Sequence, residues 1–177
     1  GDPGLAALFL PGGAPVKVGD RLRQPDTAAS LRLIAREGAA ALYEGAIGAA
    51  LTTHMAAHGG LISQRDLADY RIIEREPVRG TYRGFEIAGP PPPSSSGVHI
   101  VQMLNILEGY DLAAMGFGSA QTSHLLAEAL KIAFADRAVA TADPAFVNVP
   151  VERLTSKSYA GERRARIDLH RAQDWRP

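Results

Sequence analysis

A run of serines behind a run of prolines is the most unusual chemistry-bearing feature of this sequence. Pro90–Pro93 are followed by Ser94, Ser95, Ser96 and Gly97, and helical periodicity begins immediately afterwards. Backbone N–H groups at a helix start can hold an anion, and a neighbouring hydroxyl can assist them. The simpler alternative is a rigid strand-to-helix connector in which one serine is the N-cap. No Gly-x-Ser-x-Gly elbow is present, so the serines do not indicate a hydrolase nucleophile.

A second group of ionisable residues lies in an alanine-rich helical segment. Asp136 and Arg137 are adjacent, and Asp136 follows Ile132 by four residues, on the side of the helix that should pack. A carboxylate in such a position is normally paired, with an arginine or a helix end as the expected partner. Asp136 and Arg137 are therefore interpreted as a structural charge pair, with catalysis as the less favoured alternative.

Histidines and arginines offer two further patterns. His54 and His58 stand at i and i+4, so both can face one metal ion from a helix. The intervening glutamate of a zinc peptidase is absent and no third ligand is evident, so no metal site is predicted. Four arginines near the C-terminus are interrupted by acidic residues and are interpreted as a solvated face. They are Arg163, Arg164, Arg166 and Arg171.

Composition narrows the class of protein. The 177 residues include 19 Lys plus Arg and 19 Asp plus Glu, so the formal net charge is zero. Neither nucleic acid nor an anionic membrane is an expected partner of such a chain. The absence of cysteine excludes disulfides, thiolate nucleophiles and cysteine-based metal sites. No run approaches the roughly 20 apolar residues of a membrane helix. The start lacks both an initiator Met and a basic region, which indicates a chain processed or excised from something longer.

Hydrophobic periodicity predicts helices joined by short breaks. A helix is expected from Pro25 to Glu37, since proline suits the first turn and Gly38 suits the position after the last. Residues 1–24 and 168–177 are expected to be loop-like ends of a single partial domain over residues 1–177. The other expected helices cover residues 39–43, 47–58, 64–70, 98–108 and 119–140, with a last one capped by Thr155 and running to Ile167.

One stretch has the period of strands. Val78–Tyr82 and Phe85–Ala88 flank Arg83-Gly84, which predicts a β-hairpin. A lone hairpin is marginal in water, so this one is expected to join a sheet supplied by another chain or by a missing part of this one. The predicted fold class is α+β, a mostly helical piece with one hairpin.

Several blocks, in order, resemble the C-terminal half of the large subunit of γ-glutamyltranspeptidases. Each block is weak by itself, but their order and spacing over about residues 12–168 make the set specific. The blocks are Val18–Leu22 with Gln24-Pro25, Leu33–Gly38 with Leu42–Gly45, Gly59–Ile62 with Asp66–Tyr70, Pro77–Gly84, Pro91–Gly97, Gln102–Tyr110, Ala133–Arg137, Asp143-Pro144 with Phe146-Val147, and Leu154–Tyr159.

The resemblance implies an N-terminal nucleophile hydrolase. In this family a precursor cleaves itself into a large and a small subunit, and the Thr that begins the small subunit attacks a γ-glutamyl amide such as glutathione. The acyl group then passes to water or to an amino acid. The assembled fold is a four-layer αββα sandwich, and no cofactor is needed. The implied partners are that small subunit, the N-terminal half of the large subunit and a small γ-glutamyl substrate.

The resemblance assigns no catalytic residue to this chain. The family's Gly-Gly-Thr-Thr-His-like nucleophile segment is not found here, and the substrate-binding arginine and oxyanion donors lie on other parts of the enzyme. Only Ser94, Ser95, Ser96 and Gly97 are expected next to the active centre. Ser96 departs from the family, which often has Gly there, so this loop is expected to be stiffer.

Two alternatives stay open. The first is a related enzyme, either a cephalosporin or glutaryl acylase or a capsule-processing relative, distinguished by pocket residues outside this chain. The second is a helical binding module without chemistry of its own. The family resemblance implies a periplasmic or secreted enzyme, with a cytoplasmic location still open. It also implies that this chain is inactive alone.

Overall fold

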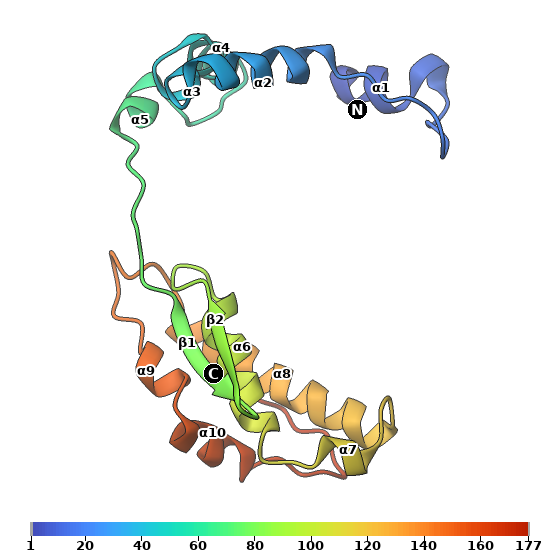
Figure 1. Ribbon diagram of the computed structural model, residues 1–177, viewed down its shortest axis with the longest axis vertical. Coiled ribbons are helices and arrows are strands. Elements are labelled where there is room, and N and C mark those ends of the chain that lie inside the picture. The colour runs from blue at the N-terminus through green and yellow to red at the C-terminus, as the bar shows by residue number, and fades with distance from the viewer. Residues whose placement is uncertain (1, 177) are drawn as a thin grey trace. The chain divides into compact units, whose positions relative to one another are not determined.

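The computed structural model describes residues 2–176 (Figure 1). One partial domain is expected over residues 1–177; the described residues form two compact units, the first ending at Ile73 and the second beginning at Glu74. No helix in residues 2–176 is both long enough and apolar enough to cross a membrane.

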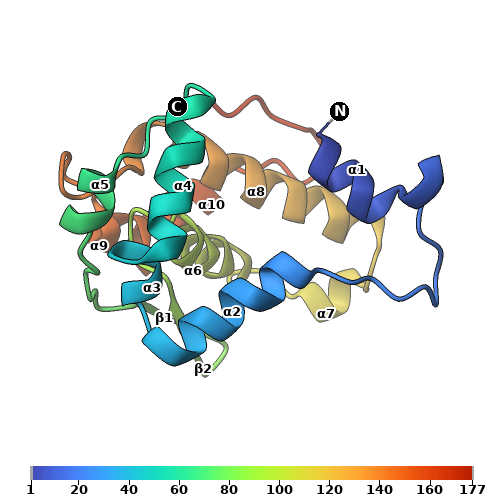
Figure 2. The same ribbon diagram turned by 90° about the horizontal axis from the view of Figure 1, so that it is seen from above.

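Within the described residues 2–73 of the first unit, the regular elements are all helices, and they are joined by irregular segments (Figure 2). The prediction that residues 1–24 are a loop is wrong at its start, because Asp2 caps a helix by accepting a hydrogen bond from the Leu5 N–H at 2.8 Å. An acidic N-cap followed by Pro3 in the first turn is a standard helix opening. Its elements are α1 (Pro3–Phe9), the 3₁₀ turn η1 (Pro11–Gly13), α2 (Pro25–Glu37), α3 (Ala40–Tyr43), α4 (Ala46–Ala57) and α5 (Gln64–Asp69).

Local signals set the helix ends in this unit. The predicted bounds of α2 are confirmed, and Gly38 follows it with a φ of 65°. Ser63 and Asp66 form a complete capping box at the start of α5. Packing within the unit is sparse: Leu31 and Ile34, which share one apolar face of α2, remain 60% and 40% exposed. The apolar face of α2 is therefore not covered by residues 2–73.

The second unit holds the hairpin and the remaining helices (Figure 1). The predicted hairpin and the two long helices are confirmed. The elements are β1 (Val78–Tyr82), β2 (Phe85–Gly89), α6 (Ser96–Leu107), α7 (Leu112–Met115), α8 (Ala120–Ala140), α9 (Val151–Leu154) and α10 (Lys157–Arg164).

The hairpin turns through the two residues that the sequence indicated. Arg83 and Gly84 have φ values of 47° and 86°, as a two-residue type I′ turn requires. The strands pair antiparallel from Val78 opposite Gly89 to Tyr82 opposite Phe85. The Glu108 carboxylate holds the turn, accepting from the Arg83 N–H at 2.6 Å and from Lys157 Nζ at 2.5 Å. These two donors, Lys157 first, keep the pKa of Glu108 below its usual value.

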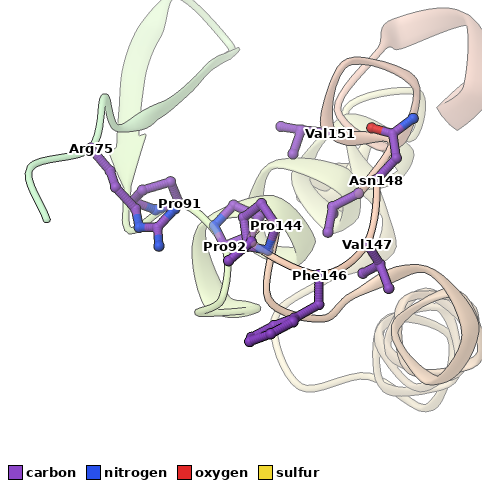
Figure 3. A pocket seen from close by; sticks show the side chains of 10 residues that line it. Arg75, Pro91, Pro92, Pro144, Phe146, Val147, Asn148 and Val151 are labelled. Carbon is purple, nitrogen blue, oxygen red and sulfur yellow. The ribbon is translucent and has the colours of Figure 1, made fainter.

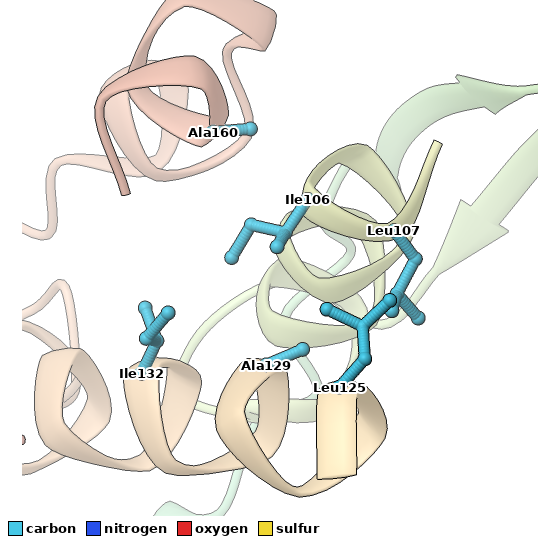
Figure 4. Packing of buried hydrophobic residues seen from close by; sticks show 6 residues of the cluster. All are labelled: Ile106, Leu107, Leu125, Ala129, Ile132 and Ala160. Atoms are coloured by element: carbon cyan, nitrogen blue, oxygen red, sulfur yellow. The ribbon is translucent and has the colours of Figure 1, made fainter. Parts of the chain in front are cut away.

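Helix α6 is the centre of the second unit. It packs against both strands on one side and against α8 on another (Figure 1). Figure 4 shows side chains from α6, α8 and α10 meeting in one cluster. The apolar residues that recur at helical spacing in α8, namely Leu125, Ala129, Ile132 and Ala133, are all buried. The cluster comprises Ile106, Leu107, Leu125, Ala129, Ile132 and Ala160.

The last helix corrects one expectation. Thr155 does not cap it: its hydroxyl donates to the Val151 carbonyl at 2.8 Å and so closes α9. Ser156 is the N-cap of α10, accepting from the Tyr159 N–H at 3.1 Å. Thr155 and Ser156 are adjacent, and both residue types favour the N-cap position, so the sequence alone does not distinguish which of them caps the helix. Within the described chain, residues 168–176 carry neither helix nor strand.

Candidate functional site

The serine loop, Ser94–Gly97, continues into α6, whose first two residues are Ser96 and Gly97. Ser95 occupies the N-cap position, but its side chain makes no capping bond. Its hydroxyl accepts from Arg137 Nε at 3.0 Å, which ties the loop to α8. The Ser94 and Ser96 hydroxyls lie 3.0 Å apart and are exposed to solvent. The prediction that a serine occupies the N-cap position is therefore confirmed. The expected capping hydrogen bond is absent, because the Ser95 hydroxyl accepts from Arg137 instead.

Gly97 brings the start of α6 against the end of β2. A Cβ atom there would lie 2.3 Å from the Pro90 carbonyl oxygen and 2.8 Å from the carbonyl carbon of Gly89. These are backbone atoms, and prolines follow them, so they have little freedom to move away. The loop geometry consequently requires glycine at this position.

An open pocket lies beside the proline run (Figure 3). Its volume is about 490 Å³, and Pro91 and Pro92 form one side of it. Arg75 supplies a positive charge, with its guanidinium 3.9 Å from an Asp143 carboxylate oxygen. The remaining lining residues are Pro144, Ala145, Phe146, Val147, Asn148, Val149 and Val151. Pro91 and Pro92 thus connect this pocket to Ser94–Gly97, which follow them in the chain.

Asp136 is a buried hydrogen-bond acceptor for three side chains, which come from α6 and α10. It is 3% exposed and accepts from Gln102 Nε2 at 2.5 Å and from the Tyr159 hydroxyl at 2.9 Å. The Arg163 guanidinium forms a hydrogen-bonded ion pair with its other oxygen. Asp136, predicted to be a structural charge, thus has its ion-pair partner in α10.

The predicted pairing of Asp136 with Arg137 is wrong. Successive helical residues point about 100° apart, so a residue directed into the core leaves its neighbour directed elsewhere. Asp136 faces α6 and α10, whereas the exposed Arg137 lies over the Phe134 ring, 5.6 Å from its centre, and donates to Ser95.

A buried histidine extends this network along α6. His99 Nδ1 lies 2.8 Å from Gln102 Oε1, and its Nε2 lies 2.8 Å from the Thr141 hydroxyl. Because an ionised carboxylate only accepts, Gln102 must turn its amide nitrogen to Asp136 and its oxygen to His99. Nδ1 of His99 therefore donates to Gln102, and Nε2 faces the Thr141 hydroxyl.

Two arginines enclose the tyrosine of the network. The guanidinium carbons of Arg153 and Arg163 lie 5.0 and 5.1 Å from the centre of the Tyr159 ring. Burial, and then the hydrogen bond to Asp136, raises the pKa of the Tyr159 hydroxyl. Tyr159 consequently stays neutral and keeps its proton for Asp136.

The sequence patterns did not identify several residues of this hydrogen-bond network. Arg163 was grouped with a solvated arginine face, yet its side chain is only 19% exposed. The usable signal was the spacing of Tyr159 and Arg163, which puts both on one side of a helix. His99 and Gln102 lie on the buried side of α6, among the apolar residues that marked that helix.

The side-chain contacts described above have a structural role. In residues 2–176 no serine hydroxyl is hydrogen-bonded to a histidine, so the described chain holds no serine–histidine nucleophile pair. His54 and His58 stack with ring centres 4.0 Å apart, and the described residues contain no cluster of three or more side chains suited to a metal ion. The serine loop and the pocket beside it can offer hydroxyl groups, backbone polar groups and the Arg75 guanidinium to a molecule that binds there.

Comparison with known proteins decides the family. The gamma-glutamyltranspeptidase sequence model matches residues 1–177. The chain belongs to the γ-glutamyltranspeptidase family. It is 70% identical over 174 residues to the Acylase ACY 1 proenzyme of Pseudomonas sp. strain SE83, covering 98% of this chain and 31% of that protein. It is 46% identical over 167 residues to the glutathione hydrolase proenzyme of Escherichia coli K12, covering 94% of this chain and 29% of that protein.

A solved structure supports the same γ-glutamyltranspeptidase assignment. The crystal structure of Helicobacter pylori γ-glutamyltranspeptidase superposes with a TM-score of 0.86 at 38% identity, over 94% of this chain and 48% of that one. The predicted fold class, α+β with helices and a two-stranded antiparallel sheet, is confirmed. The chain spans about a third of the length of the curated γ-glutamyltranspeptidase relatives that it matches.

Proposed function

We propose that this chain is part of the large subunit of an enzyme that transfers γ-glutamyl groups from amides such as glutathione to water or to an amino acid. The observation that carries the proposal is the match of the whole sequence to the γ-glutamyltranspeptidase family, with 46% identity to a glutathione hydrolase proenzyme. The nucleophile in this proposal is the N-terminal Thr of a partner subunit, whose own amine serves as the base.

The contribution of this chain is positional. No catalytic residue is assigned to it, and the rest of the large subunit and the small subunit supply the reacting groups. Two observations support a role in assembly: the hairpin has no third strand within residues 2–176, and the apolar face of α2 is left exposed. A sheet contributed by the partner would pair the hairpin edges and extend them into the four-layer αββα sandwich.

The serine loop is proposed as the part of this chain nearest to the active centre. Ser94 and Ser96 expose their hydroxyls, and the pocket of about 490 Å³ lies against the same proline run. Both features are available to a partner or a substrate. The enzyme is proposed to be periplasmic or secreted and to need no cofactor.

An acylase is the second candidate, favoured by the 70% identity to the Acylase ACY 1 proenzyme. The two candidates share one mechanism and differ in the acyl group. A γ-glutamyl group carries an α-amine, which a glutaryl group lacks. A site built to bind that amine leaves polar groups unpaired when the amine is missing, and such sites discriminate strongly.

Paired chromogenic substrates test this assignment. The full-length processed protein is expected to hydrolyse γ-glutamyl-p-nitroanilide with a kcat/KM at least about 100-fold above that for glutaryl-p-nitroanilide. The two substrates share the leaving group, so the ratio reports recognition of the α-amine. A ratio reversed in favour of the glutaryl substrate would establish the acylase candidate, and hydrolysis of neither would contradict both.

A further inference from the structure

Glu128 is a buried carboxylate that lies outside the Asp136 network. It is 1% exposed, on the inner side of α8. Lys131 Nζ donates to Oε1 at 2.7 Å from one turn further along the helix. The Trp175 indole N–H donates to Oε2 at 2.6 Å, and the Gln173 N–H reaches Oε1 at 3.4 Å. Two of these three donors therefore come from the segment 168–176.

The segment 168–176 has few other attachments. His124 Nε2 donates to the Asp168 carbonyl at 2.8 Å, one helical turn before Glu128. Leu169 and Trp175 pack against the core cluster of α6 and α8, and the Arg166 guanidinium lies 5.0 Å from the centre of the Trp175 ring. Most of the other residues of the segment are exposed. One face of α8 thus supplies nearly all of its polar contacts.

Burial makes these contacts interdependent. A carboxylate removed from water needs charged or hydrogen-bonding partners, and the loss of one leaves a costly unpaired group. If the segment leaves α8, water replaces its two donors and Lys131 remains, so release does not strand a buried charge. A segment without regular structure, with few apolar contacts and with polar contacts to only two side chains of one helix, is the kind of element that opens locally while the rest stays folded.

We propose that Glu128 is a latch that fastens the segment 168–176 to α8 through Trp175 and Gln173, and that the segment docks and releases as a unit according to the charge on Glu128. The ionised carboxylate accepts all three donors. The protonated form gains a donor of its own and loses the charge that strengthens the bonds to Lys131 and Trp175.

The charged groups around the latch fix the direction of its pH dependence. Lys131 faces Glu128 from α8, His124 faces the segment from the same helix, and Arg166 lies on Trp175. Burial raises the pKa of Glu128, but the hydrogen bonds from Lys131, Trp175 and Gln173 outweigh it and hold the pKa below the usual 4.5. A lowered pKa stabilises the docked state above pH 4.5, and this stabilisation is lost as the pH falls through the docked value. Protonated His124 keeps its Nε2–H, so it still donates to Asp168.

Hydrogen exchange followed by mass spectrometry tests the latch in the full-length protein. Glu128→Gln and Trp175→Phe are each expected to speed exchange of the Gln173 backbone amide, the amide of residues 169–176 that donates to Glu128, by about tenfold or more at pH 7. Peptides from α6 and from the first turns of α8 should exchange as in the unaltered protein. Glu162→Gln is the matched control, because Glu162 is an exposed glutamate on α10.

Two results would overturn the proposal. Exchange of residues 169–176 that is equal in Trp175→Phe, Glu162→Gln and the unaltered protein would show that the indole N–H fastens nothing. Faster exchange that spreads equally over α6, α8 and the segment in Trp175→Phe would show that the segment is part of the core rather than a separate unit.

Discussion

Replacing Asp136 with asparagine is expected to lower the thermal unfolding midpoint of the processed protein by on the order of 10 °C. Asp136 neutralises Arg163 in a site that is almost closed to solvent, with relative side-chain exposures of 5% and 19%. Breaking a buried ion pair on one side costs about 3–5 kcal/mol. Asparagine also replaces one of the two oxygens with an N–H₂ group, which would face either the Arg163 donor or the donors of Gln102 and Tyr159, so it cannot restore the network.

The substitution Arg137→Gln is the matched control for this prediction. Arg137 is adjacent to Asp136 but exposed, and its loss removes only a hydrogen bond to Ser95 and a contact with Phe134. Its unfolding midpoint is expected to stay within a few degrees of the unaltered value. Differential scanning calorimetry on both variants gives the comparison. A fully processed Asp136→Asn enzyme of unchanged midpoint, with only a raised KM, would show that the carboxylate serves substrate binding instead.

Replacing Gly97 with alanine is expected to destabilise the junction between β2 and α6 by about 1–3 kcal/mol or more. The added methyl group would overlap the backbone at Gly89 and Pro90, and these atoms belong to a strand end and a proline run. Because α6 contacts the hairpin, α8 and α10, a shift at its first turn spreads into the core. Calorimetric midpoints, together with the yield of folded protein, measure the effect.

The substitution Ser96→Ala is the control for Gly97→Ala. It adds no volume, lies one residue away in the same helical turn, and removes an exposed hydroxyl whose contact is with Ser94. Its effect on stability is expected to stay within about 0.5 kcal/mol. Equal midpoints for Gly97→Ala and Ser96→Ala would contradict the close packing assigned to Gly97.

Features that depend on neighbouring residues were predicted well from the sequence. The bounds of α2 and the Arg83-Gly84 turn follow from proline and glycine at set positions. The buried faces of α6 and α8 follow from helical spacing. The helix at Pro3–Phe9 was not predicted, because the glycines and prolines of residues 11–19 interrupt the helical period of the N-terminal stretch.

Contacts between distant residues were not predictable in the same way. Arg163 joins Asp136 across 27 positions, and Trp175 joins Glu128 across 47. Local patterns contain no information on which of several arginines meets a buried carboxylate, since that choice is made when α6, α8 and α10 pack together. Asp136 could be identified as a charge on a packing face, but its partner required the tertiary structure.

We propose that this chain works only within a processed enzyme whose nucleophile begins a partner subunit. Intact-mass analysis of the native preparation, combined with a γ-glutamyl-p-nitroanilide assay of the same fractions, decides whether this is so. Activity is expected only in fractions where the polypeptide that carries this chain is accompanied by a second polypeptide whose first residue is Thr. Hydrolysis of the anilide by this 177-residue chain in the absence of any other polypeptide would contradict it.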